Sequence, residues 1–305
     1  MSINIATKAK IIRKIGEKIS FKKLLTISPL PRQETEILLA WLLKKPREYL
    51  LSHPETPITP SLQKKFRALA NKRQKNYPLA YLIDHKEFYG LEFKVSPKVL
   101  IPRPETELIV DEIIKLAKNK AQDIVDLGTG SGAIIISAAQ EIKKAKPKIY
   151  KKSNFLAVDI SAAALKIAKE NARRHRLDSK IKFFSGNLLL PLLPLMSQIK
   201  HERSTIIAAN LPYLSPAQIK ASPSIWREPR LALESGPDGL RHYRELFKQL
   251  STLRPPHAEM TLLCEIDPKQ AEKISQILRK NWPTAKIIVK KDLAGHKRLI
   301  NAQLK

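Results

Sequence analysis

A glycine-rich turn at residues 123–132 (DIVDLGTGSG) has the composition of a ligand-binding loop. A short apolar run ends at Asp126, and glycines follow at positions 128, 130 and 132 before an apolar run typical of a helix. Because glycine has no Cβ, the backbone can turn tightly there and approach a ligand closely, at the N-terminus of the next helix. No Gly-Lys-Ser/Thr follows, which excludes a nucleoside-triphosphate loop. A structural turn and a dinucleotide site stay open at this point.

Asp159 ends a second apolar run, residues 154–159, and Ser161 is placed to cap a predicted helix at 162–174. In nucleotide-binding folds, a carboxylate at the tip of the second strand accepts hydrogen bonds from ribose hydroxyls. The interval between Gly128 and Asp159 exceeds the spacing of about 20 residues typical of that motif. We attribute the surplus to a basic loop at 143–152 (KKAKPKIYKK). We predict that Asp159 binds ribose, with a structural cap as the alternative.

The sequence Asn-Leu-Pro-Tyr follows the apolar run STIIAA, and open α/β sheets bind ligands at the carboxyl ends of such strands. The nitrogen of an amide or an exocyclic amine is planar and a poor nucleophile, because its lone pair is delocalised. A site for such a group must accept hydrogen bonds from both N–H groups and present the face of the planar group to an electrophile. We predict that the Asn210 side chain and the Leu211 carbonyl accept these hydrogen bonds. We also predict that Pro212 stiffens the turn and that Tyr213 stacks on the planar group. An ordinary turn with a buried tyrosine is the alternative.

Arg103 lies between two prolines in residues 99–110 (VLIPRPETELIV). The prolines fix an extended segment, and acidic residues then open a helix whose dipole they suit. An arginine in this setting has few conformations, so we predict that Arg103 is presented to a substrate. A rigid strap between domains is the alternative.

These motifs need a sheet to bring them together, and the chain contains the strands for one. Residues 8–95 show helical periodicity broken by prolines, beginning with isoleucines at 11, 12 and 15, and residues 77–95 are more β-like. Apolar runs after the glycine turn predict strands at 154–159, 181–184, 204–209, 261–266, 286–289 and 298–302. We therefore predict an α/β fold with a seven-stranded sheet. The predicted divisions are a helical domain (1–76), a β-hairpin linker (77–98) and the α/β domain (99–305).

The pattern Asp-x-Gly-x-Gly-x-Gly resembles motif I of class I S-adenosylmethionine-dependent methyltransferases, which have a Rossmann-like seven-stranded sheet. The resemblance implies that the glycine turn holds the methionine end of S-adenosylmethionine. It also implies that residues after the third strand lie near the adenine, where Asn187 stands in place of the usual acid and accepts without a charge. The implied cofactor-binding residues are Gly128, Thr129, Gly130, Ser131, Gly132, Asp159, Asn187, Leu188 and Asn210.

Several stretches together resemble the protein N(5)-glutamine methyltransferases of the HemK/PrmC type, which act on peptide chain release factors. The matching sequences are ETEILLAWLL, YPLAYLIDHKEFYGLEFKVSPKVLIPRPETE, IVDLGTGSGAI, AVDIS, NLPY, EPRLALESGPDGLRHYRELF and LLCEID. The resemblance implies methylation of the glutamine in the release factors' Gly-Gly-Gln motif, with S-adenosylmethionine as donor and the helical domain in release-factor recognition. It implies Asn210, Pro212 and Tyr213 as catalytic residues. The implied substrate-binding residues are Asn210, Leu211, Pro212, Tyr213 and Arg103.

Three positions depart from that family's pattern, and the first of them leaves the substrate open. Leu211 stands where the family usually has proline, and Asn-Leu-Pro-Tyr is similar to the motif of rRNA adenine dimethyltransferases. Asn187 is uncharged, and Pro255, Pro256 and His257 replace glycines before the fifth strand. The enzyme alternatives are an N(6)-adenine methyltransferase on rRNA or DNA and a glutamine methyltransferase on a ribosomal protein. A non-catalytic RNA- or ribosome-binding protein on a methyltransferase fold is the alternative outside enzymes.

Composition narrows the classes further. The 305 residues are 43% hydrophobic with only 9 glycines, which excludes disordered and fibrous classes. The single cysteine, Cys264, excludes an internal disulfide framework, and the scattered histidines lack the spacing of a zinc site. A net charge of +28 favours polyanionic neighbours such as RNA or ribosomes, although a merely solvated basic surface explains it equally well. No apolar run approaches the roughly 20 residues of a membrane helix, so we expect a cytoplasmic protein. We also expect a monomer.

Overall fold

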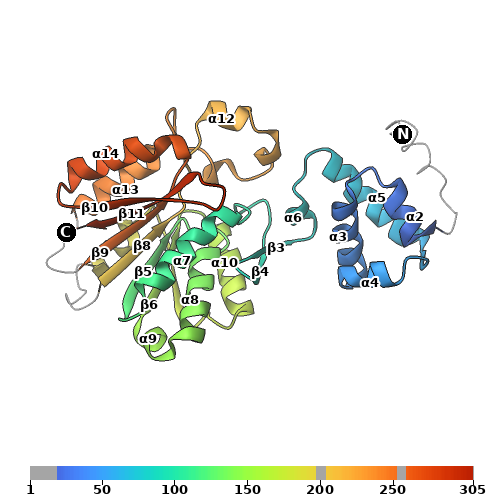
Figure 1. Cartoon of the computed structure of the whole chain (residues 1–305), viewed down its shortest axis with the longest axis horizontal. Coiled ribbons are helices and arrows are strands. Elements are labelled where there is room, and N and C mark those ends of the chain that lie inside the picture. The colour runs from blue at the N-terminus through green and yellow to red at the C-terminus, as the bar shows by residue number, and fades with distance from the viewer. Residues whose placement is uncertain (1–18, 197–203, 253–258, 305) are drawn as a thin grey trace. The chain divides into compact units, whose positions relative to one another are not determined.

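The structure is a computed structural model that describes residues 19–196, 204–252 and 259–304 (Figure 1). The chain divides into two compact units, with the boundary between Asp84 and His85. The periodic isoleucines at 11, 12 and 15 and the predicted loop change at Pro255–His257 lie outside the described residues. The assignment of residues 1–76 to recognition, 77–98 to a linker and 99–305 to catalysis stays a prediction.

The first unit is a small helical domain. Its described helices are α2 (Phe21–Ile27), α3 (Arg32–Leu43), α4 (Arg47–Ser52), α5 (Pro60–Gln74) and α6 (Leu79–Leu82), with a two-stranded pair of β1 (Ile19–Ser20) and β2 (Pro57–Ile58). Phe21, Leu38, Leu39 and Phe66 are fully buried at its centre. Most of its stability therefore comes from packing of apolar helix faces, since short helices are marginal alone.

The segment predicted as a β-hairpin linker is only partly extended. Residues 85–94 form the hairpin, with β3 (His85–Phe88) paired antiparallel to β4 (Leu91–Lys94). Residues 79–82 instead form the helical turn α6, so the β-like prediction is wrong there. Pro78 precedes this turn, and one turn of helix buries both Tyr81 and Leu82. Packing and the helix propensity of leucine and alanine thus outweigh the β propensity of Tyr81.

The second unit contains the predicted seven-stranded sheet. Its strands are β5 (Gln122–Leu127), β6 (Asn154–Asp159), β7 (Ile181–Ser185), β8 (Ser204–Ala209), β9 (Met260–Glu265), β10 (Lys286–Lys291) and β11 (Lys297–Leu304). Their order is β10-β11-β9-β8-β5-β6-β7, and β11 runs antiparallel to both neighbours. Leu127 pairs with Val158 and Ala209, so the ends of β5, β6 and β8 lie side by side. The strand order reverses at this edge, where such sheets bind ligands.

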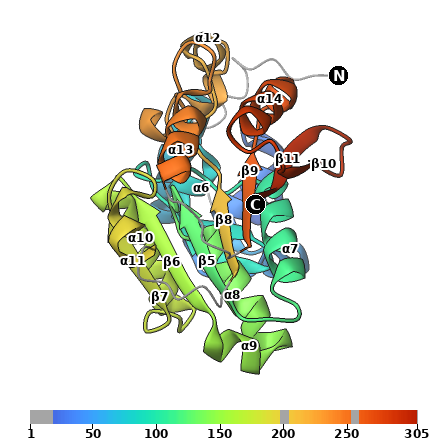
Figure 2. The same ribbon diagram turned by 90° about the vertical axis from the view of Figure 1, so that its left-hand side faces the viewer.

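Helices cover both faces of the sheet (Figures 1 and 2). α7 (Glu107–Leu116), α8 (Ala133–Ala145) and α10 (Ala162–Arg174) pack with Ile124 of β5 in one core. α13 (Arg241–Thr252) and α14 (Ala271–Asn281) pack with Val125 and Leu127 in the other. Successive residues of a strand point to opposite faces, and both faces are covered here, which is why β5 is buried throughout. The remaining short helices are η1 (Pro104–Thr106), α9 (Pro147–Lys152), η2 (Leu190–Leu192), α11 (Leu193–Met196), α12 (Pro216–Lys220), η3 (Pro223–Ile225), η4 (Arg230–Ala232) and η5 (Pro268–Gln270).

The basic segment 143–152 is helical except at Lys146, and the prediction of a loop there is wrong. α8 continues to Ala145, and Pro147 begins α9 at its first position. Proline suits a helix start because its fixed φ is helical and its missing N–H has no partner there, and lysine is a good helix former. Among the described residues, no helix has the length and apolar character to cross a membrane.

Candidate active site

A cleft of about 1110 Å³, including space open to solvent, lies at the carboxyl ends of β5, β6 and β8. Most of the predicted site residues line it: Arg103, Gly128, Thr129, Gly130, Ser131, Asp159, Asn187, Leu188, Asn210, Leu211 and Pro212. Gly132 and Tyr213 do not line it. The sheet therefore brings together, at one edge, residues that are more than 100 positions apart in the chain.

The glycine turn is built as its sequence predicts. Gly128, Gly130 and Gly132 all have positive φ, of 70°, 55° and 82°, which side chains disfavour. A Cβ on Gly130 would have only the Gly128 carbonyl within 4 Å, so the space beside it belongs to the cleft. A Cβ on Gly132 would lie 2.8 Å from Ile136 Cδ1 and 3.4 Å from the Ala168 Cβ. Gly132 thus allows α8 to pack on α10 and is not in the cleft lining.

Asp159 faces the cleft with its carboxylate already oriented. Oδ2 accepts from the Gly130 N–H and Oδ1 accepts from the Ser161 N–H, each at 2.8 Å. Ser161 also caps α10, as predicted, by accepting from the Ala164 N–H. Burial raises the pKa of Asp159 above its usual range, and the two backbone donors act against this. Each carboxylate oxygen keeps a lone pair for a further donor in the cleft.

Asp126, the acid of the glycine motif, has a different place. It is fully buried beneath the turn, and its Oδ2 accepts from the Thr129 hydroxyl at 2.7 Å. Burial raises the pKa of Asp126 to about 7, with the nearby Asp159 charge adding to the effect. Asp126 therefore stabilises the turn from the protein interior and does not line the cleft.

Asn210 is held from behind by a chain of polar side chains. Its Nδ2 donates to the Thr106 hydroxyl at 3.0 Å, and that hydroxyl donates to Glu265 Oε2 at 2.6 Å. Thr106 belongs to the Pro-Arg-Pro segment's short helix η1, and Glu265 is the last residue of β9. Three segments far apart in sequence thus meet at the predicted amide-binding asparagine.

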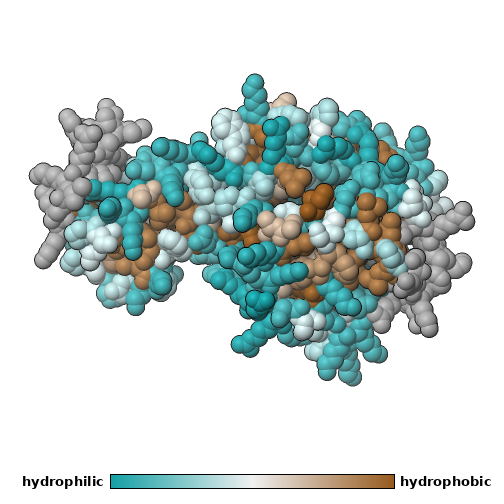
Figure 3. Space-filling model, turned by 180° about the vertical axis from the view of Figure 1, so that it is seen from behind, coloured by the Kyte–Doolittle hydropathy of each residue, from teal (hydrophilic) through white to brown (hydrophobic). Residues whose placement is uncertain are grey.

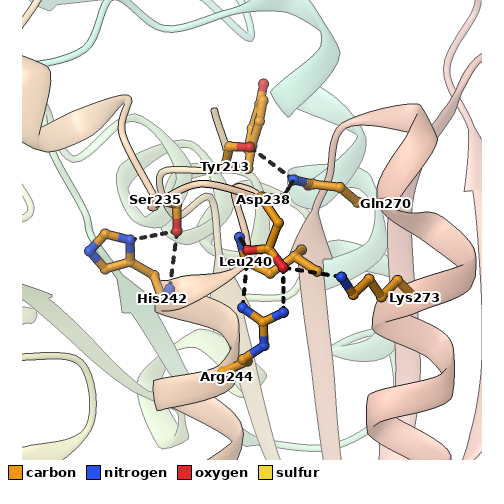
Figure 4. Close-up of polar contacts among 8 residues, drawn as sticks. All are labelled: Tyr213, Ser235, Asp238, Leu240, His242, Arg244, Gln270 and Lys273. Atoms are coloured by element: carbon orange, nitrogen blue, oxygen red, sulfur yellow. Dashed lines mark hydrogen bonds and ion pairs between the residues drawn. The ribbon is translucent and has the colours of Figure 1, made fainter. Parts of the chain in front are cut away.

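Tyr213 lies behind the cleft and is fixed at both ends. Its hydroxyl donates to Glu265 Oε1 at 3.2 Å, and its carbonyl accepts from Gln270 Nε2 at 2.9 Å. Figure 4 shows this contact beside the turn that carries Asp238, whose carboxylate pairs with Arg244 and Lys273. A Cβ on Gly239 would lie 2.2 Å from the Tyr213 carbonyl oxygen, so this turn requires glycine.

Leu211 packs its side chain against the glycine turn. It is 3% exposed, and a Cβ on Gly128 would lie 3.3 Å from Leu211 Cδ2. The side chain is therefore part of the wall between the turn and β8. Its backbone carbonyl remains the group that we assigned to a planar ligand.

Arg103 is restrained as predicted, but by a partner that its sequence context does not reveal. Its Nη2 donates to Glu228 Oε1, and Glu228 Oε2 accepts from the Ile101 N–H at 3.1 Å. The Glu228 side chain is 1% exposed and that of Arg103 is 33% exposed. This ion pair fastens the Pro-Arg-Pro segment to the loop that carries Pro229 and lines the cleft.

We predicted no site role for Thr106, Glu228, His242 or Glu265 from the sequence. Thr106 and His242 line the cleft, and the other two anchor residues that do. The available signal was an acid, Glu265, that ends a buried parallel strand at the ligand-binding edge. Across the described residues, no group of three or more His, Cys, Asp or Glu side chains is placed to hold a metal ion.

Two sequence families match this chain. One described as "PrmC N-terminal domain" matches residues 20–83, and one described as "Methyltransferase domain" matches residues 118–218. A protein of Moorella thermoacetica named "Release factor glutamine methyltransferase" is 38% identical over 251 residues, 82% of this chain and 83% of the relative. A protein of the same name from Coxiella burnetii is 36% identical over 293 residues, 96% of this chain and 98% of the relative.

Solved structures with the same fold are more distant in sequence. The human METTL16 catalytic domain, in a complex with a MAT2A 3′UTR hairpin, superposes with a TM-score of 0.56 at 13% identity, covering 88% of this chain and 90% of that chain. The N-terminal domain of human METTL16 in complex with SAH gives a TM-score of 0.51 at 14% identity, covering 87% of this chain and 93% of that chain. At these identities the likeness establishes the fold.

Proposed function

The chain belongs to the release factor glutamine methyltransferases, and from this membership we propose the roles of its cleft residues in methylating the glutamine amide of the release factors' Gly-Gly-Gln motif. The enzyme is an S-adenosylmethionine-dependent protein glutamine methyltransferase. The observation that carries the residue assignment is the meeting of the glycine turn, Asp159 and Asn210 in one cleft.

The cleft residues fit S-adenosylmethionine by their chemistry. Glycines with positive φ leave space where side chains would project, and the Asp159 oxygens have lone pairs for two ribose hydroxyls. Asn187 and Leu188 follow β7 and are assigned to the adenine end. When bound, the cofactor supplies an electrophilic methyl group on a sulfonium centre. The protein's own part is to hold the acceptor nitrogen beside it.

The glutamine amide is assigned to the turn after β8. The Asn210 Oδ1 and the Leu211 carbonyl accept from its two N–H groups, and Pro212 limits the motion of the turn. Tyr213 supports this turn from behind the cleft. Positioning of this kind can contribute roughly 7–11 kcal/mol to a well-oriented reaction. Acceptors at Asn210 and Leu211 also stabilise positive charge that develops on the amide as the N–C bond forms, and the methylated nitrogen then loses one proton to water.

The decisive variant is Asn210→Ala. We expect binding of S-adenosylhomocysteine to stay within a few-fold of wild type, because Asp159 and the glycine turn are untouched. We expect methylation of a release factor to fall by at least 100-fold, since removing one preorganised group of this kind costs about 10²–10³ in rate. The rate of methylation is measured as the transfer of a labelled methyl group from the cofactor to the release factor. Full activity of Asn210→Ala would overturn the assignment.

The exocyclic amine of adenine is a second group that this site could hold as the acceptor of the methyl group. It too is a planar nitrogen with two N–H groups, and Leu211 in place of proline is the observation that favours it. Incubating the enzyme with labelled cofactor and either a release factor or rRNA discriminates between the two. Transfer to the release factor alone excludes this second function.

We also propose nonspecific RNA or ribosome contact through basic surface. The lysines at the end of α8 and on α9 are exposed: Lys143, Lys144, Lys146, Lys148, Lys151 and Lys152. Figure 3 shows hydrophilic side chains over much of one face, interrupted by apolar patches. Binding of RNA through such charges weakens steeply with salt because counterions are released.

We further propose that the protein acts as a monomer in the cytoplasm, which sedimentation and cell fractionation test.

A further inference from the structure

Glu265 connects Asn210, which the proposed function assigns to the amide, with Tyr213, which supports the same turn from behind the cleft. It is 2% exposed and does not line the cleft. One of its oxygens accepts from Thr106, which in turn accepts from Asn210, and the other accepts from Tyr213. Burying a carboxylate costs free energy of folding, so a buried glutamate behind a binding site calls for a functional explanation.

The chain of hydrogen bonds has a direction. Thr106 has a single hydroxyl proton, and this proton is donated to the Glu265 carboxylate at 2.6 Å. The Thr106 oxygen can therefore only accept from Asn210, which must turn its Nδ2 toward Thr106 at 3.0 Å. The Asn210 Oδ1 is then left for the cleft. A reversed chain would point the Asn210 NH₂ at the substrate amide, so that a donor would face a donor.

We propose that Glu265 is a positioning residue: as a carboxylate it keeps the Asn210 acceptor aimed into the cleft through Thr106 and holds Tyr213 directly. This inference rests on the proposed function, because it assumes that the Asn210 oxygen binds the substrate's N–H group. Burial raises the pKa of Glu265 above its usual range, and the Thr106 hydroxyl, the Arg298 charge and the Tyr213 hydroxyl act against this.

The test begins with Glu265→Gln, which keeps the shape but places an NH₂ donor against Thr106 or Tyr213. We expect kcat for release-factor methylation to fall by at least 30-fold. We expect the Kd for S-adenosylhomocysteine to change by less than twofold. The matched control is Glu112→Gln, since Glu112 is another buried carboxylate that accepts from Lys290 and from Asn301, at 2.9 Å, outside the cleft. That control should keep kcat within twofold of wild type.

Thr106 supplies a second test that does not depend on Glu265→Gln folding. Thr106→Val removes the hydroxyl at constant shape and should lose most of the kcat that Glu265→Gln loses, since the contact of Glu265 with Tyr213 remains. Thr106→Ser restores the hydroxyl and should recover turnover to within about threefold of wild type. Glu265→Gln combined with Thr106→Val should lose clearly less than the sum of the two single losses, because both break the chain to Asn210 and only Glu265→Gln also disturbs Tyr213.

The outcomes separate the two proposals. A wild-type enzyme that does not methylate a release factor overturns the proposed function. A wild-type enzyme that does so while Glu265→Gln keeps kcat within threefold overturns only the role of Glu265. Fully additive losses in the double variant, or an equal loss in Glu112→Gln, also overturn that role.

Discussion

The main-chain N–H of Gly130 donates a 2.8 Å hydrogen bond to Oδ2 of Asp159, which fastens the turn after β5 to the tip of β6. Ser161 N–H holds the other carboxylate oxygen at the same distance. The two parts of the cofactor site that the sequence presents separately are therefore one hydrogen-bonded unit. Because the carboxylate is oriented before any ligand arrives, binding costs less ordering of the site.

Asp159→Asn should weaken cofactor binding by about 10- to 150-fold, which corresponds to the roughly 1.5–3 kcal/mol of a hydrogen bond to a charged group. Asparagine has one acceptor oxygen, so its NH₂ must face the N–H of Gly130 or Ser161. Titration with S-adenosylhomocysteine measures the affinity. Asp123→Asn is the control. Asp123, on β5, is buried like Asp159, but it lies outside the cleft. Unchanged affinity in Asp159→Asn would contradict the ribose assignment.

The glycines of the turn should separate into a packing position and a binding position. Gly132→Ala should destabilise the fold by about 2–4 kcal/mol, because it adds strain at φ 82° to a 2.8 Å approach to Ile136. Gly130→Ala should cost only about 1–2 kcal/mol, yet it should weaken cofactor binding more than Gly132→Ala does.

Urea denaturation and ligand titration of both variants check this prediction. Gly295→Ala is the control for backbone strain alone, since Gly295 has φ 83° and a Cβ there would meet nothing within 4 Å. Equal stability losses in Gly132→Ala and Gly295→Ala would show that the contact with Ile136 relaxes freely.

The sequence predicted the local parts of this fold well. β6, β8 and α10 have the bounds that we expected, because apolar runs and the Ser161 cap mark them locally. Helix α9 was missed because a lysine-rich segment with a proline has the composition of a loop as well as of a helix start. The contacts of Glu228 and Glu265 span 125 and 159 positions, and they arise from strand order and loop closure. No local pattern around either acid records its partner.

Glu228→Gln should destabilise the enzyme by about 2–3 kcal/mol, below the 3–5 kcal/mol for breaking a fully buried pair because Arg103 is partly exposed. Glutamine has one acceptor oxygen for two donors, Arg103 and the Ile101 N–H. Glu234→Gln is the control, since its partner Arg230 is 72% exposed, and it should cost less than about 1 kcal/mol. Urea denaturation at fixed pH compares the two, and equal losses would argue against a buried clamp.

Asp126 should make wild-type stability fall as pH rises from about 4 to 7. The pKa of Asp126 is about 7 in the folded protein against an ordinary 3.8, so between these values the folded protein holds a proton that the unfolded chain has released. Each pH unit in this window then costs about 1.4 kcal/mol of stability, and the whole window costs at most about 4 kcal/mol.

Asp126→Asn removes this contribution of Asp126 to the pH dependence and leaves the other carboxylates in place. The difference in free energy of unfolding between wild type and Asp126→Asn, measured by urea denaturation across the window, should therefore change with pH in favour of the variant. A difference that stays constant from pH 4 to 7 would show that Asp126 is ionised throughout, with its charge stabilised by the Thr129 hydroxyl and the Ile135 N–H of α8.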